Sequence, residues 1–535
     1  MARYLHVLPS AVAFMLAVAL FAICLRNDFV YDDVLLLQMD DRISPPENWI
    51  RYLTESYNGG VDNLYRPLVS LSYAVQKHLH PSSIWPFFAV NILLHAGCAA
   101  AVAELTRRIM KFATHPGLRR RDLSQKPDLT PEGPFLLPAA RTRHAAVAML
   151  AGCLFAVHPV HAEAVASVVG RAETLCALAM VTAMILFLRP MTGTRVMAIW
   201  ACAVIAILSK EQGILLPLIL LIQHRLLRIT PGHRRSGMVL LVLMLTWTWA
   251  GYILFREATL KFWWDRSLLD WTQQPIILAT GIDRWLAPVA ILGRYAQLML
   301  FPSQLSLDYG YAFTTPNVAA TDRYLWLGIA TAVVWCACAL AAWLKRDRVI
   351  GFVLLAMAIT YCVISNAPTL IGTIMGERLL YLPSTFVIIV AAMGLGSIGR
   401  TGVVIGTVLV MACSVWTLSY IRQFDDRLTL YQYSVDARPS SGKLRLLLVS
   451  ELVNQNQLRE AAAQADETIA RLPEMPEAWY QAGFVALTRR EYDAAERYLE
   501  EAMRLYRNPS KAAALMQRVY DQRTAEPATQ SVAPR

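Results

Sequence analysis

Charged residues are scarce in this sequence, and their scarcity excludes most classes of soluble protein. Asp, Glu, Lys and Arg make up 17% of the 535 residues, whereas hydrophobic residues make up 56%. The mean hydropathy is +0.40. Apolar runs of about 20 residues recur along the chain, and that length crosses the hydrocarbon core of a bilayer. The composition therefore predicts an all-α polytopic membrane protein.

Paired cysteines are missing from the polar loops. All nine cysteines lie inside or beside apolar runs, where a cysteine behaves as a small hydrophobic side chain. A disulfide framework or a cysteine-ligated zinc site needs regular cysteine spacing in polar segments. We therefore expect the cysteines to be packing residues.

The first apolar run also lacks the small-residue cleavage site that ends a secretory signal peptide, so we expect it to be retained as a membrane anchor. About eleven spans are predicted: residues 5–25, 84–106, 144–158, 172–188, 196–208, 213–224, 238–255, 325–343, 349–364, 384–399 and 402–420. A further apolar stretch at 285–301 is expected to be re-entrant or interfacial at the outer side. If it crossed, the basic turn 345–348 would lie on the wrong side.

Basic side chains are concentrated in one loop, which sets the expected orientation. Residues 107–143 contain nine Arg and Lys side chains and three Asp and Glu side chains, and such loops are cytoplasmic. The N-terminus is then cytoplasmic, and two long loops, about 26–83 and 256–324, face outward with the C-terminal region. Because the other basic turns also lie between spans, topology explains the net charge of +11 better than nucleic-acid binding does.

The composition turns polar, Ala-rich and Glu/Arg-rich after Tyr420, which predicts soluble helices over 422–522. One tetratricopeptide repeat is legible from the spacing of Trp479, Gly483, Ala495, Leu499 and Ala502. A degenerate copy lies earlier, at Ala461, Ala465 and Thr468. We expect an extracytoplasmic repeat domain that binds partners, followed by a disordered tail over 523–535.

Two adjacent carboxylates, Asp32 and Asp33, follow the first apolar run. Acidic groups at a membrane boundary stay ionised only where water or a cavity reaches them. A carboxylate there can act as a base or hold a cation, and the alternative is a solvated loop at the exit of a helix. We take both residues as candidate catalytic groups.

Histidines recur near the expected outer ends of spans. Pro159 interrupts the helix between His158 and His161, so the spacing alone does not establish a metal site. Two alternatives remain: His161 and Glu163 bind a metal, or these side chains only form hydrogen bonds within the protein. A divalent metal is the one cofactor that the sequence leaves open. His95, inside a span, is more typical of a packing residue than of a functional one.

Three cations reach the expected outer face from separate segments: Arg171, Lys210 and Arg378. Each could be neutralised by a neighbouring acid, as charges in membranes usually are. Together they could instead bind the phosphate of a lipid, Arg through paired hydrogen bonds and Lys as a point charge. The groups expected to support the site are Arg66, His95, His158, His161, Glu163, Glu211 and Glu377.

Seven motifs occur in order along most of the chain: FVYDD (29–33), YRPL (65–68), NILLH (91–95), HPVHAEAV (158–165), VGRAE (169–173), KEQG (210–213) and ERLLYLPS (377–384). In them the sequence resembles the transmembrane, tetratricopeptide-repeat-containing O-mannosyltransferase family. The resemblance implies a GT-C glycosyltransferase fold over 1–421. It also implies transfer of a sugar, mannose in the family, from a polyprenyl phosphate to a protein Ser/Thr hydroxyl at the extracytoplasmic face.

Carried onto this sequence, the resemblance makes Asp32 or Asp33 the base and Arg171, Lys210 and Arg378 the contacts to the donor phosphate. Only about two repeats are legible, which resembles a short bacterial or protist relative, so the sugar and the acceptor stay open. The membrane would be the inner membrane of a bacterium or the endoplasmic reticulum of a eukaryote. A transporter of lipid-linked sugars and a membrane-anchored repeat scaffold are the competing interpretations.

Overall fold

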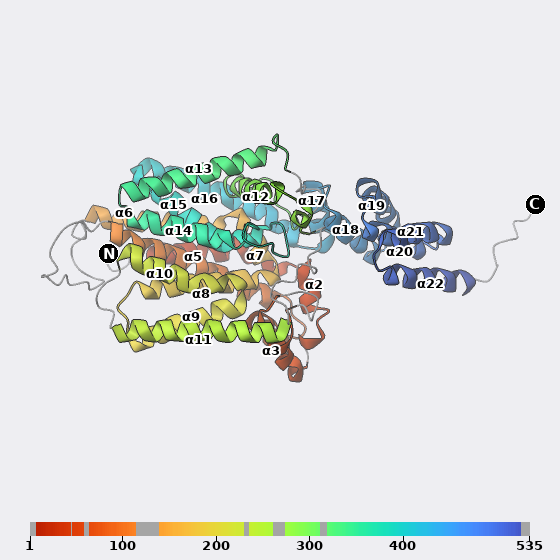
Figure 1. Cartoon of the computed structure of the whole chain (residues 1–535), viewed down its shortest axis with the longest axis horizontal. Coiled ribbons are helices and arrows are strands. Elements are labelled where there is room, and N and C mark those ends of the chain that lie inside the picture. Colours follow the sequence, from red (N-terminus) through yellow and green to blue (C-terminus); the bar gives the residue numbers. More distant parts are fainter. Residues whose placement is uncertain are drawn as a thin grey trace, which may run out of the picture.

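The computed structural model describes residues 7–43, 45–57, 64–113, 138–228, 235–260, 273–310 and 318–525. Every regular element in these ranges is a helix. Most of the long helices up to residue 421 lie side by side in one bundle along the long axis, and the later helices project from one end of it (Figure 1). An all-α architecture is thus confirmed for the part of the chain described.

A helix occurs at each of the eleven places where a span was predicted: α1 (Leu8–Phe21), α5 (Trp85–Ala113), α6 (Pro138–Val157), α8 (Arg171–Phe187), α9 (Gly193–Ser209), α10 (Leu216–Leu227), α11 (Arg235–Leu260), α13 (Arg323–Leu344), α14 (Arg348–Cys362), α15 (Tyr381–Ser397) and α16 (Gly399–Ile421). Among the described residues, seven helices are long and apolar enough to cross a membrane. The number is eight if the bent pair Thr142–Val157 and Pro159–Ala166 forms one span. The chain is therefore polytopic, and eleven crossings stay a prediction.

The helices divide into an outer set and a buried set. The apolar windows of α11 and α13 are only 17% buried, and they expose large side chains such as Trp247 and Trp343. Such contiguous exposed apolar faces are typical of contact with lipid. The apolar windows that include α5, α8 and α15 are 67%, 78% and 61% buried, so these three helices form the centre of the bundle.

α12 (Asp283–Leu300) covers most of the stretch predicted to be re-entrant or interfacial, and it crosses α13 in very close contact. A Cβ atom on Gly293 would lie 2.0 Å from the carbonyl oxygen of Tyr324, and one on Gly328 would lie 1.9 Å from that of Val289. Only glycine permits backbones to approach so closely. The crossing therefore fixes α12 on α13; its position relative to a membrane stays a prediction.

Short helices gather at the end of the bundle from which the C-terminal helices project (Figure 1). They include α2 (Asp32–Leu37), α3 (Arg51–Thr54) and α4 (Pro67–Leu79), all from the first predicted outer loop. The first residues of α6, which form the end of the basic loop, lie at the opposite end (Figure 1). The acidic pair and the start of α6 thus lie at opposite ends of the bundle, which is the arrangement that the predicted orientation requires.

The C-terminal helices are α17 (Arg427–Ala437), α18 (Gly442–Asn454), α19 (Leu458–Arg471), α20 (Pro476–Thr488), α21 (Tyr492–Leu505) and α22 (Ser510–Ala525). α20 and α21 pack closely at Gly483, where a Cβ atom would lie only 2.7 Å from Leu499 Cγ. The positions paired by the sequence pattern are buried alike in α19 and α21. A tetratricopeptide-repeat domain stays a prediction, and residues 526–535 of the predicted tail lie outside the described residues.

Candidate active site

Asp32, the first residue of α2, forms an ion pair with Arg378, which is far away in sequence. The Oδ2 atom of Asp32 lies 2.9 Å from Nη2 of Arg378. Arg378 belongs to a short 3-10 helix, Glu377–Leu380, that leads into α15. The side chains are 30% and 25% exposed, so both reach solvent. The structure thus brings together one predicted base and one predicted phosphate ligand at an accessible position.

The residue before Asp32 has a strained backbone. Tyr31 has φ 53° and ψ −121°, a conformation that side chains with a Cβ rarely adopt and that costs roughly 1–3 kcal/mol. Its backbone N–H donates to the Oη atom of Tyr431 in α17 at 3.1 Å. Strain of this kind persists only where surrounding contacts hold it, and here those contacts fix the start of α2.

Asp33 points into the protein and is fully buried. Its Oδ1 atom accepts hydrogen bonds from the Ser167 hydroxyl (2.9 Å) and the Val169 N–H (2.8 Å), and its Oδ2 atom accepts one from the Val168 N–H (3.1 Å). Burial raises the pKa of Asp33 to about 6, although these donors act in the opposite direction. Asp33 therefore ties α2 to the segment before α8 and leaves Asp32 as the accessible carboxylate.

Replacing Asp33 by Asn is expected to reduce stability. The Asn amide group would face N–H or O–H donors, leaving a buried donor without an acceptor at a cost of about 1–3 kcal/mol in the free energy of unfolding. Thermal or denaturant unfolding in detergent measures this loss. Asp41→Asn, an exposed change in the same loop, is the control. Equal stability of Asp33→Asn and the wild type would show that these bonds do not stabilise the fold.

Arg378 also contacts a second, buried carboxylate. Its backbone N–H donates to Glu163 Oε2 at 3.0 Å, and its Nε atom lies 3.4 Å from Glu163 Oε1. Glu163, in the short helix α7 (Ala162–Ala166), is 3% exposed. The guanidinium therefore lies between a buried acid, which orients it, and Asp32 at the surface.

Glu377 has a different role from that of its neighbour Arg378. Its Oε1 atom accepts hydrogen bonds from the Ser306 N–H at 2.7 Å and from the Tyr309 hydroxyl at 2.6 Å. The side chain is fully buried. Glu377 thus anchors the segment that follows α12, in the second predicted outer loop, beside the Asp32–Arg378 pair.

The predicted cation Lys210 lies in a buried ion pair. Its Nζ atom is 2.5 Å from Glu173 Oε1, and the two side chains are 4% and 3% exposed. Arg66 pairs in the same way with Glu211 at 2.8 Å, and these side chains are 12% and 29% exposed. Neutralisation by a neighbouring acid, the alternative left open by the sequence, is thus the observed arrangement for Lys210.

Arg171 is buried among uncharged acceptors. Its guanidinium donates to the side chains of Asn91 (3.0 Å), Ser72 (3.1 Å) and Gln76 (2.8 Å). These hydrogen bonds join α8 to α4 and α5, and the Arg171 side chain is only 1% exposed. Arg171 and Lys210 are thus almost fully buried, whereas Arg378 reaches solvent. A shared phosphate site for the three cations stays a prediction.

The three histidines predicted to support the site use both ring nitrogens in hydrogen bonds within the protein. Those of His95 contact the Tyr381 hydroxyl (2.7 Å) and a backbone carbonyl (3.1 Å). Those of His161 contact the Ser384 hydroxyl and a carbonyl, both at 2.8 Å, and those of His158 bond to backbone groups. In the described ranges no three His, Cys, Asp or Glu side chains gather to hold a metal ion. The geometry favours the hydrogen-bonded alternative.

Sequence reasoning missed Lys443, in the first turn of α18, because it assigned that region to partner binding. The Nζ atom of Lys443 lies 4.6 Å from the centre of the Tyr31 ring. Burial alone would raise the pKa of Asp32, but the positive charges of Arg378 and Lys443 hold it below its usual range. Asp32 is therefore an anion, stabilised chiefly by the charges of Arg378 and Lys443.

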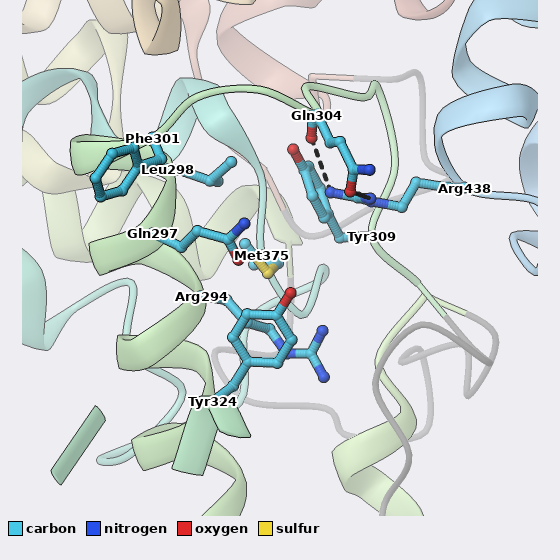
Figure 2. Close-up of a pocket in the computed structure, with 9 residues that line it drawn as sticks. All are labelled: Arg294, Gln297, Leu298, Phe301, Gln304, Tyr309, Tyr324, Met375 and Arg438. Carbon is cyan, nitrogen blue, oxygen red and sulfur yellow. Dashed lines mark hydrogen bonds between the residues drawn. The ribbon is translucent and has the colours of Figure 1, made fainter. Parts of the chain in front are cut away.

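A small pocket borders the site on the side of the C-terminal helices. Its cavity volume is about 10 Å³, and it is lined by Arg294, Gln297, Leu298, Phe301, Gln304, Tyr309, Tyr324, Met375 and Arg438. Figure 2 shows Arg438 hydrogen-bonded to Gln304 and lying against Tyr309. Since Tyr309 also donates to Glu377, the end of α17 and the loop that holds Glu377 are joined through this pocket.

Comparison with curated proteins confirms the resemblance. The chain is 24% identical to human protein O-mannosyl-transferase TMTC4 over 457 residues, which cover 74% of this chain and 57% of that protein. It is 23% identical to mouse TMTC3 over 494 residues, covering 83% and 50% of the two chains. Mouse TMTC2 matches over 221 residues at 26% identity, covering 39% and 23%.

The chain thus aligns with little more than half the length of human TMTC4. No family model matches it, and no solved structure matches it.

Proposed function

Since the curated relatives of this chain are TMTC-family protein O-mannosyl-transferases, we propose that it is an integral-membrane glycosyltransferase. It transfers a sugar, mannose in the first instance, from a polyprenyl phosphate to a Ser or Thr hydroxyl of a protein acceptor. The observation that carries the proposal is the solvent-reaching Asp32–Arg378 pair at one end of an apolar bundle. A base and a phosphate-binding cation are the two groups that this transfer needs.

Asp32 is the base in this proposal. It takes the proton from the acceptor hydroxyl as the oxygen bonds to the anomeric carbon of the sugar. The bond between that carbon and the phosphate oxygen breaks, and the lipid phosphate leaves with the electron pair. Arg378 stabilises the charge that develops on the phosphate. A single displacement of this kind inverts the configuration at the anomeric carbon.

Donor binding would also raise the pKa of the base, Asp32. In the structure Arg378 donates to Asp32, and this contact helps to hold the pKa of Asp32 low. A bound phosphate would compete for the same guanidinium and would add negative charge beside Asp32. Both effects raise the pKa of a carboxylate, so Asp32 becomes a stronger base once the donor is in place.

The proposed orientation puts this site and the C-terminal helices at the extracytoplasmic face, with eleven crossings and the acceptor bound with the help of the predicted repeats. The support comes from the placement of the acidic pair and of the start of α6, which adjoins the basic loop, at opposite ends of the bundle. The membrane would be the inner membrane of a bacterium or the endoplasmic reticulum of a eukaryote.

Cysteine labelling tests the orientation. In a variant without native cysteines, Ser124→Cys in the basic loop and Ser510→Cys at the start of α22 should react with an impermeant maleimide from opposite sides of sealed vesicles. Labelling of both from the same side would refute the odd number of crossings.

The proposed reaction is tested by incubating the purified protein with labelled polyprenyl-phosphate mannose and a Ser/Thr peptide. We expect label on the peptide in the wild type and little in Asp32→Asn. Repeating the assay with polyprenyl-phosphate glucose identifies the sugar. Absence of labelled peptide with both donors, across several peptides, would refute the proposal.

A further inference from the structure

The first C-terminal helices hold the loop that carries Asp32. The Nε atom of Arg427 in α17 donates to the Phe29 carbonyl at 2.9 Å, and the Asp28 N–H donates to the Asp425 carbonyl at 3.2 Å. With the bond from Tyr31 to Tyr431, three backbone groups within four residues of Asp32 are tied to residues 425–431. A helical domain that only recruits partners needs no such contacts.

The turn between α17 and α18 is hydrogen-bonded to the second predicted outer loop. The Ser441 hydroxyl donates to Asp308 Oδ2 at 2.7 Å, and Arg438 donates to the Gln304 carbonyl at 2.8 Å. Both partners lie in the segment anchored by Glu377. Residues 425–443 thus contact both predicted outer loops, and Lys443 lies two residues after Ser441.

We propose that Lys443 is a positioning residue of the active site, which packs on Tyr31 and places a second positive charge beside Asp32. The helices α17 and α18 are then part of the catalytic unit. This inference rests on the proposed function of Asp32, and its charge effect can be measured without transfer. The lysine acts in two ways, through the strained residue that starts α2 and through its charge.

The packing effect follows from the strain at Tyr31. A cation over an aromatic ring contributes about 0.5–2 kcal/mol, which is comparable to the cost of the unusual φ of Tyr31. Without Lys443, less would hold Tyr31 in that conformation. Asp32, the next residue, would then be less well placed for proton transfer.

The charge effect follows from the groups around Asp32. Arg378, Lys443 and Arg66 favour its anionic form, while Glu163 lies on the far side of Arg378. Lys443 in turn is stabilised as a cation by Tyr31, Asp32 and Asp308. Removal of the lysine charge should therefore let burial raise the pKa of Asp32, so the base would be protonated to a greater extent at any given acidic pH.

The test compares Lys443→Gln and Lys443→Arg with Lys511→Gln, the same charge change on exposed α22. The pH dependence of transfer is measured with polyprenyl-phosphate mannose as the probe. For Lys443→Gln we expect the acidic limb to move upward by about 0.5–1 pH unit. On the acidic limb, the transfer rate of Lys443→Gln should be several-fold lower than that of the wild type. Lys443→Arg should recover most of the wild-type rate, and Lys511→Gln should have the wild-type rate.

Labelling of Asp32 by a carbodiimide, which reacts with protonated carboxyls, follows the same titration without any transfer. Coincident labelling and pH profiles for Lys443→Gln and the wild type would overturn the proposal, even if the melting temperature fell. If the wild type transfers no sugar, the proposed function fails, and the labelling curves still decide whether Lys443 acts on Asp32.

Discussion

Asp32→Asn should lower the rate of sugar transfer by a factor of about 10² to 10⁴, the range typical for loss of a positioned base. Asn has nearly the same shape as Asp and can still accept a hydrogen bond from Arg378, but it cannot take a proton from the acceptor. The melting temperature should change little because the side chain is 30% exposed. Initial rates at saturating donor and peptide measure the effect.

Two variants serve as controls for this result. Asp41→Asn changes an exposed carboxylate of the same loop and should transfer at the wild-type rate. Asp33→Asn should lose stability, and its rate per folded molecule should fall less than that of Asp32→Asn. If Asp32→Asn keeps wild-type turnover, Asp32 is not the base; if only Asp33→Asn loses turnover, the assignment moves to Asp33.

Arg378→Gln is expected to weaken donor binding by about 10- to 100-fold, since a charge-assisted contact contributes about 1.5–3 kcal/mol. Arg378→Lys should recover only part of this loss because Lys keeps the charge without the two-pronged geometry. Donor affinity and melting temperature are measured on the same samples. Unchanged affinity in both variants would remove Arg378 from the phosphate site.

The Lys210→Gln variant distinguishes two roles for Lys210, that of a ligand to the donor phosphate and that of a member of an internal ion pair. It leaves Glu173 buried and unpaired, so a stability loss of about 3–5 kcal/mol is expected. The folded fraction should bind the donor as the wild type does. A selective loss of donor affinity in Lys210→Gln would return this lysine to the donor site and contradict the role that its buried ion pair indicates.

The sequence predicted the helices well because each apolar run has one stable form in a bilayer. It could not fix the number of crossings, because several of these helices are short. α10 has 12 residues, or about 18 Å of helix, against a hydrocarbon core of about 30 Å. Whether so short a helix crosses depends on its neighbours, which composition does not reveal.

The site was predictable where chemistry alone selects the residue. Asp32 and Arg378 are charged groups next to apolar runs, and the family resemblance strengthens the prediction that both belong to the site. Asp33 could not be separated from Asp32, because adjacent residues on a helix point about 100° apart and only packing decides which is buried. Lys443 could not be found, because nothing in the sequence pattern links α18 to the first outer loop.

Following one labelled sugar in proteoliposomes tests the central claim most directly. The vesicles contain the purified protein, polyprenyl phosphate with labelled mannose, and a Ser/Thr peptide on the side of the Asp32 loop. We predict that label leaves the lipid and becomes covalently bound to the peptide, and that Asp32→Asn slows this transfer by a factor of about 10² to 10⁴. Label that stays on the lipid but moves to the other leaflet, in the wild type and Asp32→Asn alike, would contradict a glycosyltransferase and indicate a transporter.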